Sequence, residues 1–274
     1  MIGQPSRSSL WPRIFAAAIL IPAALLAVYV GGWVLAVWTT AAGLAMAREW
    51  VQIVHRETFQ WRFALHAAAL AVSQALLAME HPDWALSAIL LVALVGSVAA
   101  QARDERGIWV ALGVLYIAVP CLAFVWLRHT APYGFLTVAW LLAVVWATDS
   151  AAYVAGSAAG GPRLAPLISP NKTWAGAIAG LAAGALATVI LAKFIGVIAF
   201  WPFVGAGVVL SFLTQCGDLA ESFLKRTFGV KNASDLIPGH GGALDRLDGL
   251  IFATLGLAAY VAQTGVSPIA WTSL

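Results

Sequence analysis

Residues 108–127 read IWVALGVLYIAVPCLAFVWL and contain no charged side chain. A helix of roughly 20 apolar residues is long enough to cross the hydrocarbon core of a bilayer. The whole chain has the same character, because 62% of its 274 residues are hydrophobic and only 10% are charged, whereas a soluble domain carries about 25% charged residues. Backbone groups in lipid must be paired within the protein, and long Ala, Leu and Val runs favour helices over a barrel. The sequence therefore predicts an all-α fold, a polytopic integral membrane helix bundle.

Similar apolar runs recur along the chain and predict about nine transmembrane helices. They cover residues 13–30, 33–47, 63–79, 84–101, 108–127, 134–156, 173–198, 203–222 and 247–265. The second run is short, so this helix could be tilted or partly re-entrant. Arg7 and Arg13 precede the first run as in a signal peptide, but no clear cleavage site follows, so we expect a retained first helix.

The positions of Lys and Arg predict the orientation, because these residues are in excess on the cytoplasmic side of a membrane. With nine spans and the N-terminus inside, all basic residues except Arg128 and Lys193 fall on that side. The two long polar loops, 157–172 and 225–246, are then cytoplasmic. We expect a multi-pass protein of a cell inner membrane whose N-terminus and polar loops face the cytoplasm.

The two halves of the chain differ in chemistry. In residues 1–130 the predicted spans hold almost no ionisable residue, and His66, the exception, is more often a hydrogen-bonded helix histidine than a ligand. In residues 131–274 acids stand inside or at the ends of the spans: Asp149, Asp218, Glu221, Asp245 and Asp248. Because charges beside lipid are costly and usually functional, we expect N-terminal scaffold helices and a C-terminal catalytic half.

Residues 215–248, QCGDLAESFLKRTFGVKNASDLIPGHGGALDRLD, form a polar island in this second half. A helix places Asp218, Ser222 and Lys225 on one face, and Glu221 and Lys225 are spaced to form an ion pair. An ordinary helix end with one salt bridge is the alternative interpretation. Asp218 favours function, because we expect it to be buried without a partner after an apolar run, which is unfavourable.

Asp245 and Asp248 also share a helical face, at the start of the last predicted span. A helix cap would explain one of them, but two inward-facing acids repel each other unless a cation lies between them. Carboxylate oxygens are hard ligands that suit magnesium. We therefore expect at least one of the two to bind a metal ion.

A glycine-rich turn, Pro238-Gly239-His240-Gly241-Gly242, precedes these acids. Glycines let the backbone approach a ligand, and the N-terminus of a helix favours anions. Although such a turn is usually only a turn, its position before paired acids makes it a candidate phosphate or nucleotide cradle. His240 could donate to a phosphate or make a structural hydrogen bond.

A second candidate segment lies in the earlier loop. Ser169 or Thr173 could cap the helix that follows, and Lys172 opposes the helix dipole there, which suggests that it faces an anion. Upstream, Asp149 stands in an apolar run four residues before Tyr153. A hydrogen-bonded pair and a contact with a metal or nucleotide both remain open for Asp149.

These residues resemble the signature of the phosphatidate cytidylyltransferase family, the CDP-diacylglycerol synthases. The signature runs Ser-x-apolar-Lys-Arg, Lys-Asp, Pro-x-His-Gly-Gly and Asp-Arg-x-Asp. The chain matches it at Ser222, Leu224, Lys225, Arg226, Lys231, Pro238, His240, Gly241, Gly242, Asp245, Arg246 and Asp248. Residues 217–222 and 169–174, and Asp149 with Tyr153 and Gly156, are also similar to the family. The resemblance covers roughly residues 145–250, and the first 130 residues match only as apolar spans.

Two positions depart from the family pattern. Asn232 stands where the family usually has Asp, and Ala175 replaces a usual Glu or Gln. Neither position is an expected metal ligand, so the departures weaken a catalytic role for these two positions and not the family resemblance.

The resemblance implies a nucleotidyltransferase of phospholipid biosynthesis that condenses CTP with phosphatidic acid to CDP-diacylglycerol and pyrophosphate. It implies Mg²⁺ on Asp218, Asp245 and Asp248, with Lys225, Arg226 and Arg246 as further catalytic residues. Substrate-binding residues would be Asp149, Ser169, Lys172, Ser222, Lys231, His240, Gly241 and Gly242. The expected partners are CTP, phosphatidic acid, the lipid bilayer and a second subunit in a homodimer, with no nucleic acid.

Three other classes share part of this pattern. A CDP-alcohol phosphotransferase also uses Asp-x-x-Asp-Gly, as at 245–249, but residues 250–260 carry none of its later charges. A CTP-dependent lipid-alcohol kinase should lack the long signature. A cation transporter could line a path with Asp149, Asp218 and Asp245, but would not need a Lys-Arg pair beside a Gly-Gly turn.

Overall fold

A computed structural model describes residues 10–56, 59–103, 105–130, 133–230, 234 and 241–271, without the side chains of residues 10–17. Nine α-helices, two short strands and a 3₁₀ helix make up the regular structure of this part of the chain. In order they are α1 (Leu10–Val30), α2 (Gly32–His55), α3 (Trp61–Ala78), α4 (Pro82–Gln101), α5 (Gly107–His129), α6 (Gly134–Ala159), β1 (Arg163–Ala165), β2 (Ser169–Thr173), α7 (Trp174–Ile195), α8 (Phe200–Thr227), α9 (Leu244–Thr264) and η1 (Pro268–Trp271).

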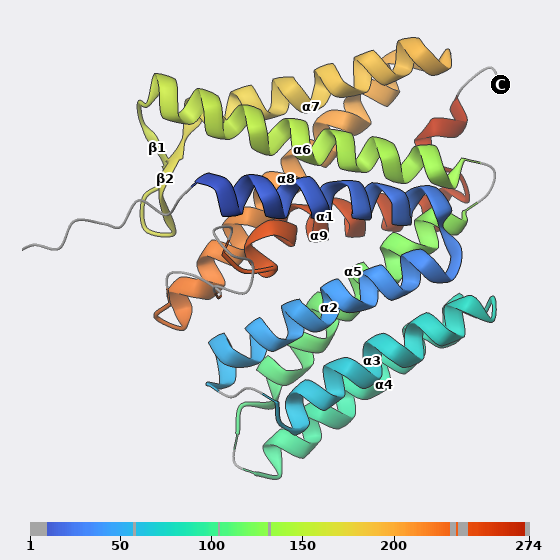
Figure 1. Ribbon diagram of the computed structural model, residues 1–274, viewed down its shortest axis with the longest axis vertical. Helices are drawn as coiled ribbons and strands as arrows, with labels where there is room; N and C mark the ends of the chain where they lie inside the picture. Colours follow the sequence, from blue (N-terminus) through green and yellow to red (C-terminus); the bar gives the residue numbers. More distant parts are fainter. Residues whose placement is uncertain are drawn as a thin grey trace, which may run out of the picture.

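The helices form a bundle with two groups (Figure 1). Helices α2 to α5 pack on one another, and α6 to α9 pack on one another, while α5 contacts both α6 and α9. Most residues of α5 between Val110 and Leu127 are buried, so the apolar stretch that indicates the fold lies in the interior of the bundle. The hairpin, the ends of α2 and α8 and the start of α9 all lie at the left end in Figure 1.

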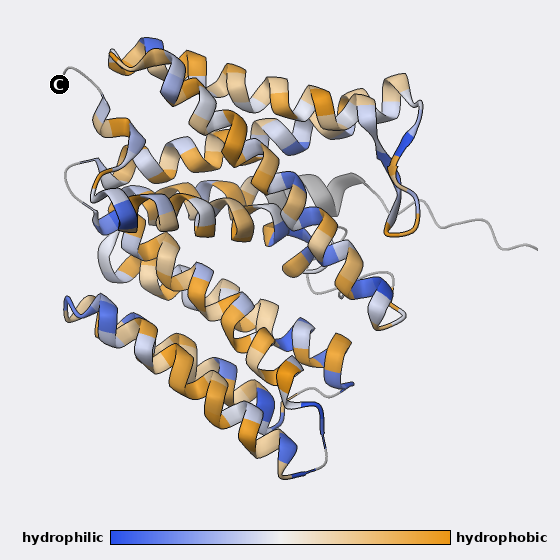
Figure 2. Cartoon of the chain, turned by 180° about the vertical axis from the view of Figure 1, so that it is seen from behind, coloured by the Kyte–Doolittle hydropathy of each residue, from blue (hydrophilic) through white to orange (hydrophobic). Residues whose placement is uncertain are grey.

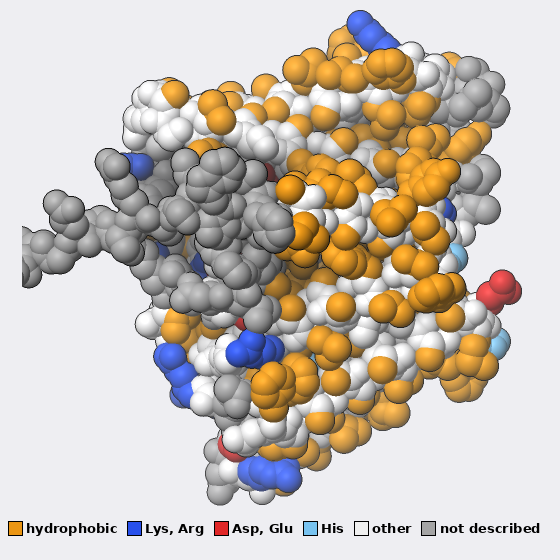
Figure 3. Space-filling view, viewed as in Figure 1, with side chains coloured by type: hydrophobic (Ala, Val, Ile, Leu, Met, Phe, Trp, Pro, Cys, Tyr) orange, Lys and Arg blue, Asp and Glu red, His pale blue; other side chains and the backbone are white. Residues whose placement is uncertain are grey.

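Hydrophobic residues run along the helices of the bundle (Figure 2), and hydrophobic side chains cover much of the described helix surface on the face shown in Figure 3. Trp33, Leu94 and Phe194 are among the large hydrophobic side chains that are more than half exposed. Seven helices, α3 to α9, are long and apolar enough to cross a membrane, and the stretch Ala18–Val30 of α1 is a shorter apolar helix. This pattern confirms the predicted all-α membrane bundle.

The second helix is longer than its apolar run suggested. Residues 33–47 were predicted as a short span that could be tilted or partly re-entrant, whereas α2 is one continuous helix from Gly32 to His55. Its last turns contain buried residues, among them Glu49 and Trp50. Burial against neighbouring helices, rather than apolar composition, therefore sets the length of α2.

The two predicted loops are shorter than expected because the flanking helices extend into them. Helix α6 continues to Ala159 and α8 continues to Thr227, so Lys225 and Arg226 lie in the last turn of α8. Within the first loop, β1 and β2 pair antiparallel, with Arg163 opposite Thr173. The Thr173 hydroxyl accepts a hydrogen bond from the Gly176 N–H (3.1 Å), which confirms Thr173 rather than Ser169 as the cap of α7.

Glycines allow α8 and α9 to touch. A Cβ atom on Gly217 would collide with the backbone oxygen of Asp248, and one on Gly249 would lie 2.7 Å from the Thr214 methyl group. Real Cβ atoms do not approach so closely, so this crossing requires glycine on both helices. It holds Asp218 of α8 beside Asp248 of α9.

Replacing Gly217 with alanine tests this crossing. Gly217→Ala should destabilise the bundle by about 1–3 kcal/mol, because the added methyl group pushes the two backbones apart. Thermal unfolding of the purified protein in detergent measures the effect.

Gly205→Ala is the matched control, since Gly205 lies in the same helix and a Cβ there meets no atom within 4 Å. Alanine has the higher helix propensity, so this variant should be as stable as the original or slightly more stable. Equal losses of stability in both variants would contradict the tight crossing.

Candidate active site

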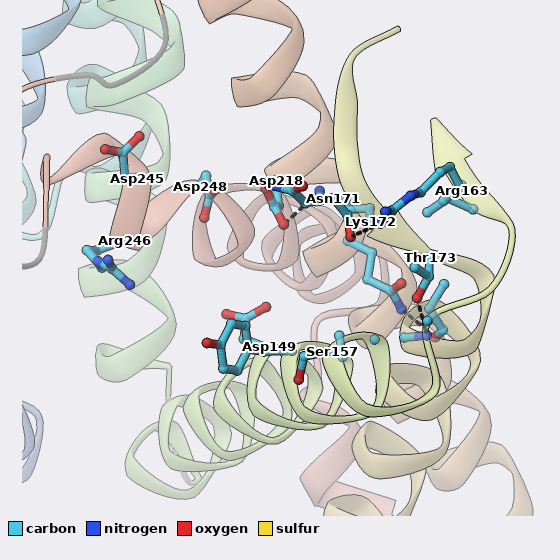
Figure 4. A pocket seen from close by; sticks show the side chains of 18 residues that line it. Asp149, Ser157, Arg163, Asn171, Lys172, Thr173, Asp218, Asp245, Arg246 and Asp248 are labelled. Carbon is cyan, nitrogen blue, oxygen red and sulfur yellow. Dashed lines mark hydrogen bonds and ion pairs between the residues drawn. The ribbon is translucent and has the colours of Figure 1, made fainter. Parts of the chain in front are cut away.

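A cavity of about 640 Å³ opens where α6, the β1–β2 hairpin, α7, α8 and α9 meet (Figure 4). Its wall combines both signs of charge. The charged residues that line it are Asp149, Arg163, Lys172, Asp218, Asp245, Arg246 and Asp248. The structure therefore brings together acids that are up to 99 residues apart in sequence, from Asp149 to Asp248.

Asp218 has a basic partner in the cavity wall. Its Oδ2 atom lies 2.7 Å from the Lys172 Nζ atom, and the two side chains are 42% and 21% exposed. The expectation of a buried and unpaired Asp218 is thus wrong, because β2 carries Lys172 to it across the cavity. Lys172 does face an anion, as its position before α7 suggested, and that anion is the Asp218 carboxylate.

Lys225 bridges two acids behind the cavity wall. Its Nζ atom lies 2.6 Å from Glu221 Oε2 and 2.7 Å from Asp245 Oδ1. The Glu221 side chain is almost fully buried, at 1% exposure. The predicted Glu221–Lys225 pair is confirmed, and the structure adds Asp245 as a second partner from the next helix.

Asp245 is engaged through both of its carboxylate oxygens. Oδ1 contacts Lys225, and Oδ2 accepts the Gly242 N–H (3.0 Å). Gly241 has a φ of +82°, where an L side chain is strained, and a Cβ there would lie 3.0 Å from Asp245 Oδ2. Gly241 and Gly242 thus form a tight turn around Asp245 at the start of α9.

The remaining acids share one side of the cavity. In Figure 4 Asp149 points from α6 toward Asp218 and Asp248, whereas Asp245 is turned away from them. Asp149 and Asp248 each experience the negative charge of Asp218. Asp248 Oδ1 also accepts the N–H of Gly249 (2.7 Å). A cation among these three acids would relieve their repulsion.

The donor atoms suit a hard divalent cation, although the described residues contain no group of three His, Cys, Asp or Glu side chains clustered tightly enough to hold a metal ion alone. Magnesium is commonly bound by one or two carboxylates together with substrate phosphates. Asp218 and Asp248 fit that role better than Asp245, whose oxygens already have partners.

Several predicted residues lie elsewhere. Arg226 donates from Nε to the Ile168 carbonyl (3.3 Å) and so ties the end of α8 to the hairpin. Some other predicted residues are not among the described cavity-lining residues: Ser169, Ser222, Lys225, Gly241 and Gly242. Lys231 and His240 lie outside the described residues.

Two residues that line the cavity or contact a helix beside it were not anticipated. Arg163, on β1, lines the cavity opposite the acids, and its position in a polar loop near Gly160 and Gly161 was the available signal. Glu49, on α2, is fully buried and accepts backbone hydrogen bonds at the start of α9. The sequence shows Glu49 just after the predicted span 33–47, but no local pattern indicates that it contacts the start of α9.

The family described as "Cytidylyltransferase family" matches residues 11–264. A phosphatidate cytidylyltransferase of Brucella suis biovar 1 (strain 1330) is 39% identical over 246 residues, which cover 90% of this chain and 91% of that protein. One of Bacillus subtilis (strain 168) is 37% identical over 154 residues, 54% of this chain and 55% of its own length.

The similarity is not confined to the C-terminal half. The resemblance in the motifs was expected to cover roughly residues 145–250, but the family match begins at residue 11 and includes the N-terminal helices. The motif residues of the polar island agree with this match, and several of them line the cavity. The chain belongs to the cytidylyltransferase family.

Proposed function

We propose that this protein is a phosphatidate cytidylyltransferase, which condenses CTP with phosphatidic acid to give CDP-diacylglycerol and pyrophosphate. The observation that carries the proposal is the 39% identity with the Brucella protein of that name over 90% of the chain. The cavity supports it, because its mixed acids and bases suit the joining of two polyanions.

The reaction requires the two phosphate groups to approach each other. A phosphate oxygen of the lipid attacks the α-phosphorus of CTP in line, a new P–O–P bond forms, and pyrophosphate leaves with the electrons of the broken bond. The attacking oxygen is already ionised at neutral pH, so no general base is needed. Positioning and charge neutralisation are then the main contributions of the protein.

The basic residues of the cavity wall supply part of this neutralisation. Arg163, Lys172 and Arg246 line the space where phosphates would lie. Lys172 is held by Asp218, so it is placed at the cavity before a substrate arrives. Arginine can contact two phosphate oxygens at once, which orients as well as neutralises.

Magnesium remains part of the proposal. Asp218 and Asp248 would hold the ion, with Asp149 nearby, while Asp245 would shape the turn through Gly242 and Lys225. The ion would neutralise phosphate charge and support the leaving pyrophosphate. In the structure Lys172 is the ion-pair partner of Asp218. A cation bound to Asp218 would take the place of Lys172, whose ammonium group could then contact a phosphate.

The membrane setting fits these substrates. CTP does not cross a bilayer, and the cavity lies at the end of the bundle that holds the β1–β2 hairpin, which belongs to a loop predicted to be cytoplasmic. We therefore place the cavity at the cytoplasmic surface of an inner membrane, where phosphatidic acid presents its phosphate. The homodimer implied by the resemblance stays a prediction.

The reaction is tested with purified protein in detergent, CTP and phosphatidic acid. We expect CDP-diacylglycerol and pyrophosphate in equal amounts when magnesium is present, and neither product in EDTA. Folded protein that forms no product with magnesium would contradict the proposal. Lipid alcohols would then be tried as acceptors, as a CTP-dependent kinase would use.

The metal assignment is tested at the cavity acids. Asp218→Asn or Asp248→Asn should lower turnover by on the order of 100-fold or more, because each removes a charged ligand. The magnesium concentration for half-maximal activity should rise wherever residual activity can be measured.

Lys193→Ala is the control for these variants. Lys193 lies in the last turn of α7, at the far end of the bundle from the cavity, and its loss should leave turnover close to normal. Near-normal activity in both aspartate variants would overturn the proposed ligands.

A further inference from the structure

The carboxylate of Glu49 is fully buried, at 0% exposure, and contacts the start of α9. Its Oε1 atom accepts the N–H of Ala243 (2.8 Å) and the hydroxyl of Ser234 (2.5 Å). Its Oε2 atom accepts the N–H of Leu244 (2.8 Å). The carboxylate thus binds three donors that lie nearly 200 residues further along the chain.

This contact supplies a helix cap that the local sequence lacks. The first N–H groups of a helix have no partner within the helix. The residue at the cap position of α9 is Ala243, which makes no side-chain capping hydrogen bond. A carboxylate at this end also interacts favourably with the helix dipole. Glu49 therefore does for α9 what an Asp or Ser at position 243 would do in an ordinary helix.

The capped segment carries two acids and one of the two arginines that line the cavity. Leu244 is followed directly by Asp245 and Arg246, and Asp248 is one turn further on. On the other side, Gly242 donates its N–H to Asp245. Glu49 itself is not among the described residues that line the cavity. Any effect it has on the reaction must therefore act through the position of α9.

We propose that Glu49 is a positioning residue for cytidylyl transfer. Its carboxylate fixes the N-terminus of α9 and thereby orients Arg246 and Asp248 toward the substrates and holds Asp245 in its turn with Gly242, an inference that rests on the proposed function. The N-terminal helices, expected to be scaffold alone, thus contribute a side chain on which the geometry of the active site depends.

The chemistry of this contact requires a carboxylate. A glutamine has nearly the same shape, but its NH₂ group would face a backbone N–H, so at least one of the three donors would lose its acceptor. An aspartate keeps the charge but is shorter by one methylene group and cannot reach both Ala243 and Leu244 from the same backbone. Glu49→Gln therefore tests the hydrogen bonds, and Glu49→Asp tests the reach.

The experiment measures steady-state kinetics of the full-length protein in detergent, together with hydrogen exchange of the backbone amides at 241–248. For Glu49→Gln we expect faster exchange in this segment, at least a 10-fold lower kcat and a several-fold higher magnesium concentration for half-maximal activity. Glu49→Asp should fall between this variant and the original protein.

Gln74→Leu is the matched control. Gln74 is also buried in the N-terminal helices, and it donates to the Cys121 carbonyl of α5 (3.2 Å). This variant should lower thermal stability while leaving the exchange of residues 241–248, the magnesium requirement and the kcat per folded molecule unchanged.

Three results would overturn the inference. Unchanged exchange at 241–248 in Glu49→Gln would show that the cap does not hold α9. Faster exchange with normal kinetics would show that the cap does not position the site. A lower kcat that follows only the loss of folded protein, with an unchanged magnesium requirement, would make Glu49 merely structural.

Failure of the proposed function is distinguishable from these results. It would appear as absence of product from the unaltered protein. The same variants would then be compared by magnesium-dependent binding of CTP, where equal affinity in Glu49→Gln and the original protein would again overturn the positioning role.

Discussion

A charged group inside an apolar bundle must have a partner, and this requirement organises the C-terminal half of the protein. Burial of an unpaired charge costs far more than a helix bundle of this size can sustain. Glu221 is buried and pairs with Lys225, which also binds Asp245. Glu49 is buried and receives three hydrogen bonds from the segment that begins α9. These contacts fix α8 and α9 relative to α2 before any substrate is present.

The same requirement separates structural acids from acids at the cavity. Asp245, Glu221 and Glu49 have their partners within the protein, whereas Asp149, Asp218 and Asp248 face a common space. Asp218 is held there by Lys172. Acids with fixed partners behind the cavity acids keep the site in place before any ligand binds, which is the condition for electrostatic preorganisation.

The features of the fold and site that could be predicted are those that depend on residues close together in the sequence. The apolar runs predicted the helices to within a few residues at most ends, because a span needs a continuous apolar stretch. The pair of Glu221 and Lys225 was predicted because it depends on residues four apart. The cap of α7 was narrowed to Ser169 or Thr173 in the same way, and the structure shows that it is Thr173. The length of α2 was not predicted, because burial of its last turns against other helices decides it. The β1–β2 hairpin was not predicted, because strands of three and five residues are too short to show a clear alternating pattern.

The sequence by itself determined a membrane helix bundle with an acidic and basic island near residue 215–248, together with the family to which the motif belongs. Helical periodicity and the hydrocarbon solvent act along the chain, so they are readable from it. Only the tertiary structure decided that Lys172 pairs with Asp218, that Asp245 is occupied by Lys225 and Gly242, and that Glu49 caps α9. Apart from the local contact of Gly242 with Asp245, these contacts join residues from 20 to 195 positions apart, and they follow from how the elements pack, which no local pattern specifies.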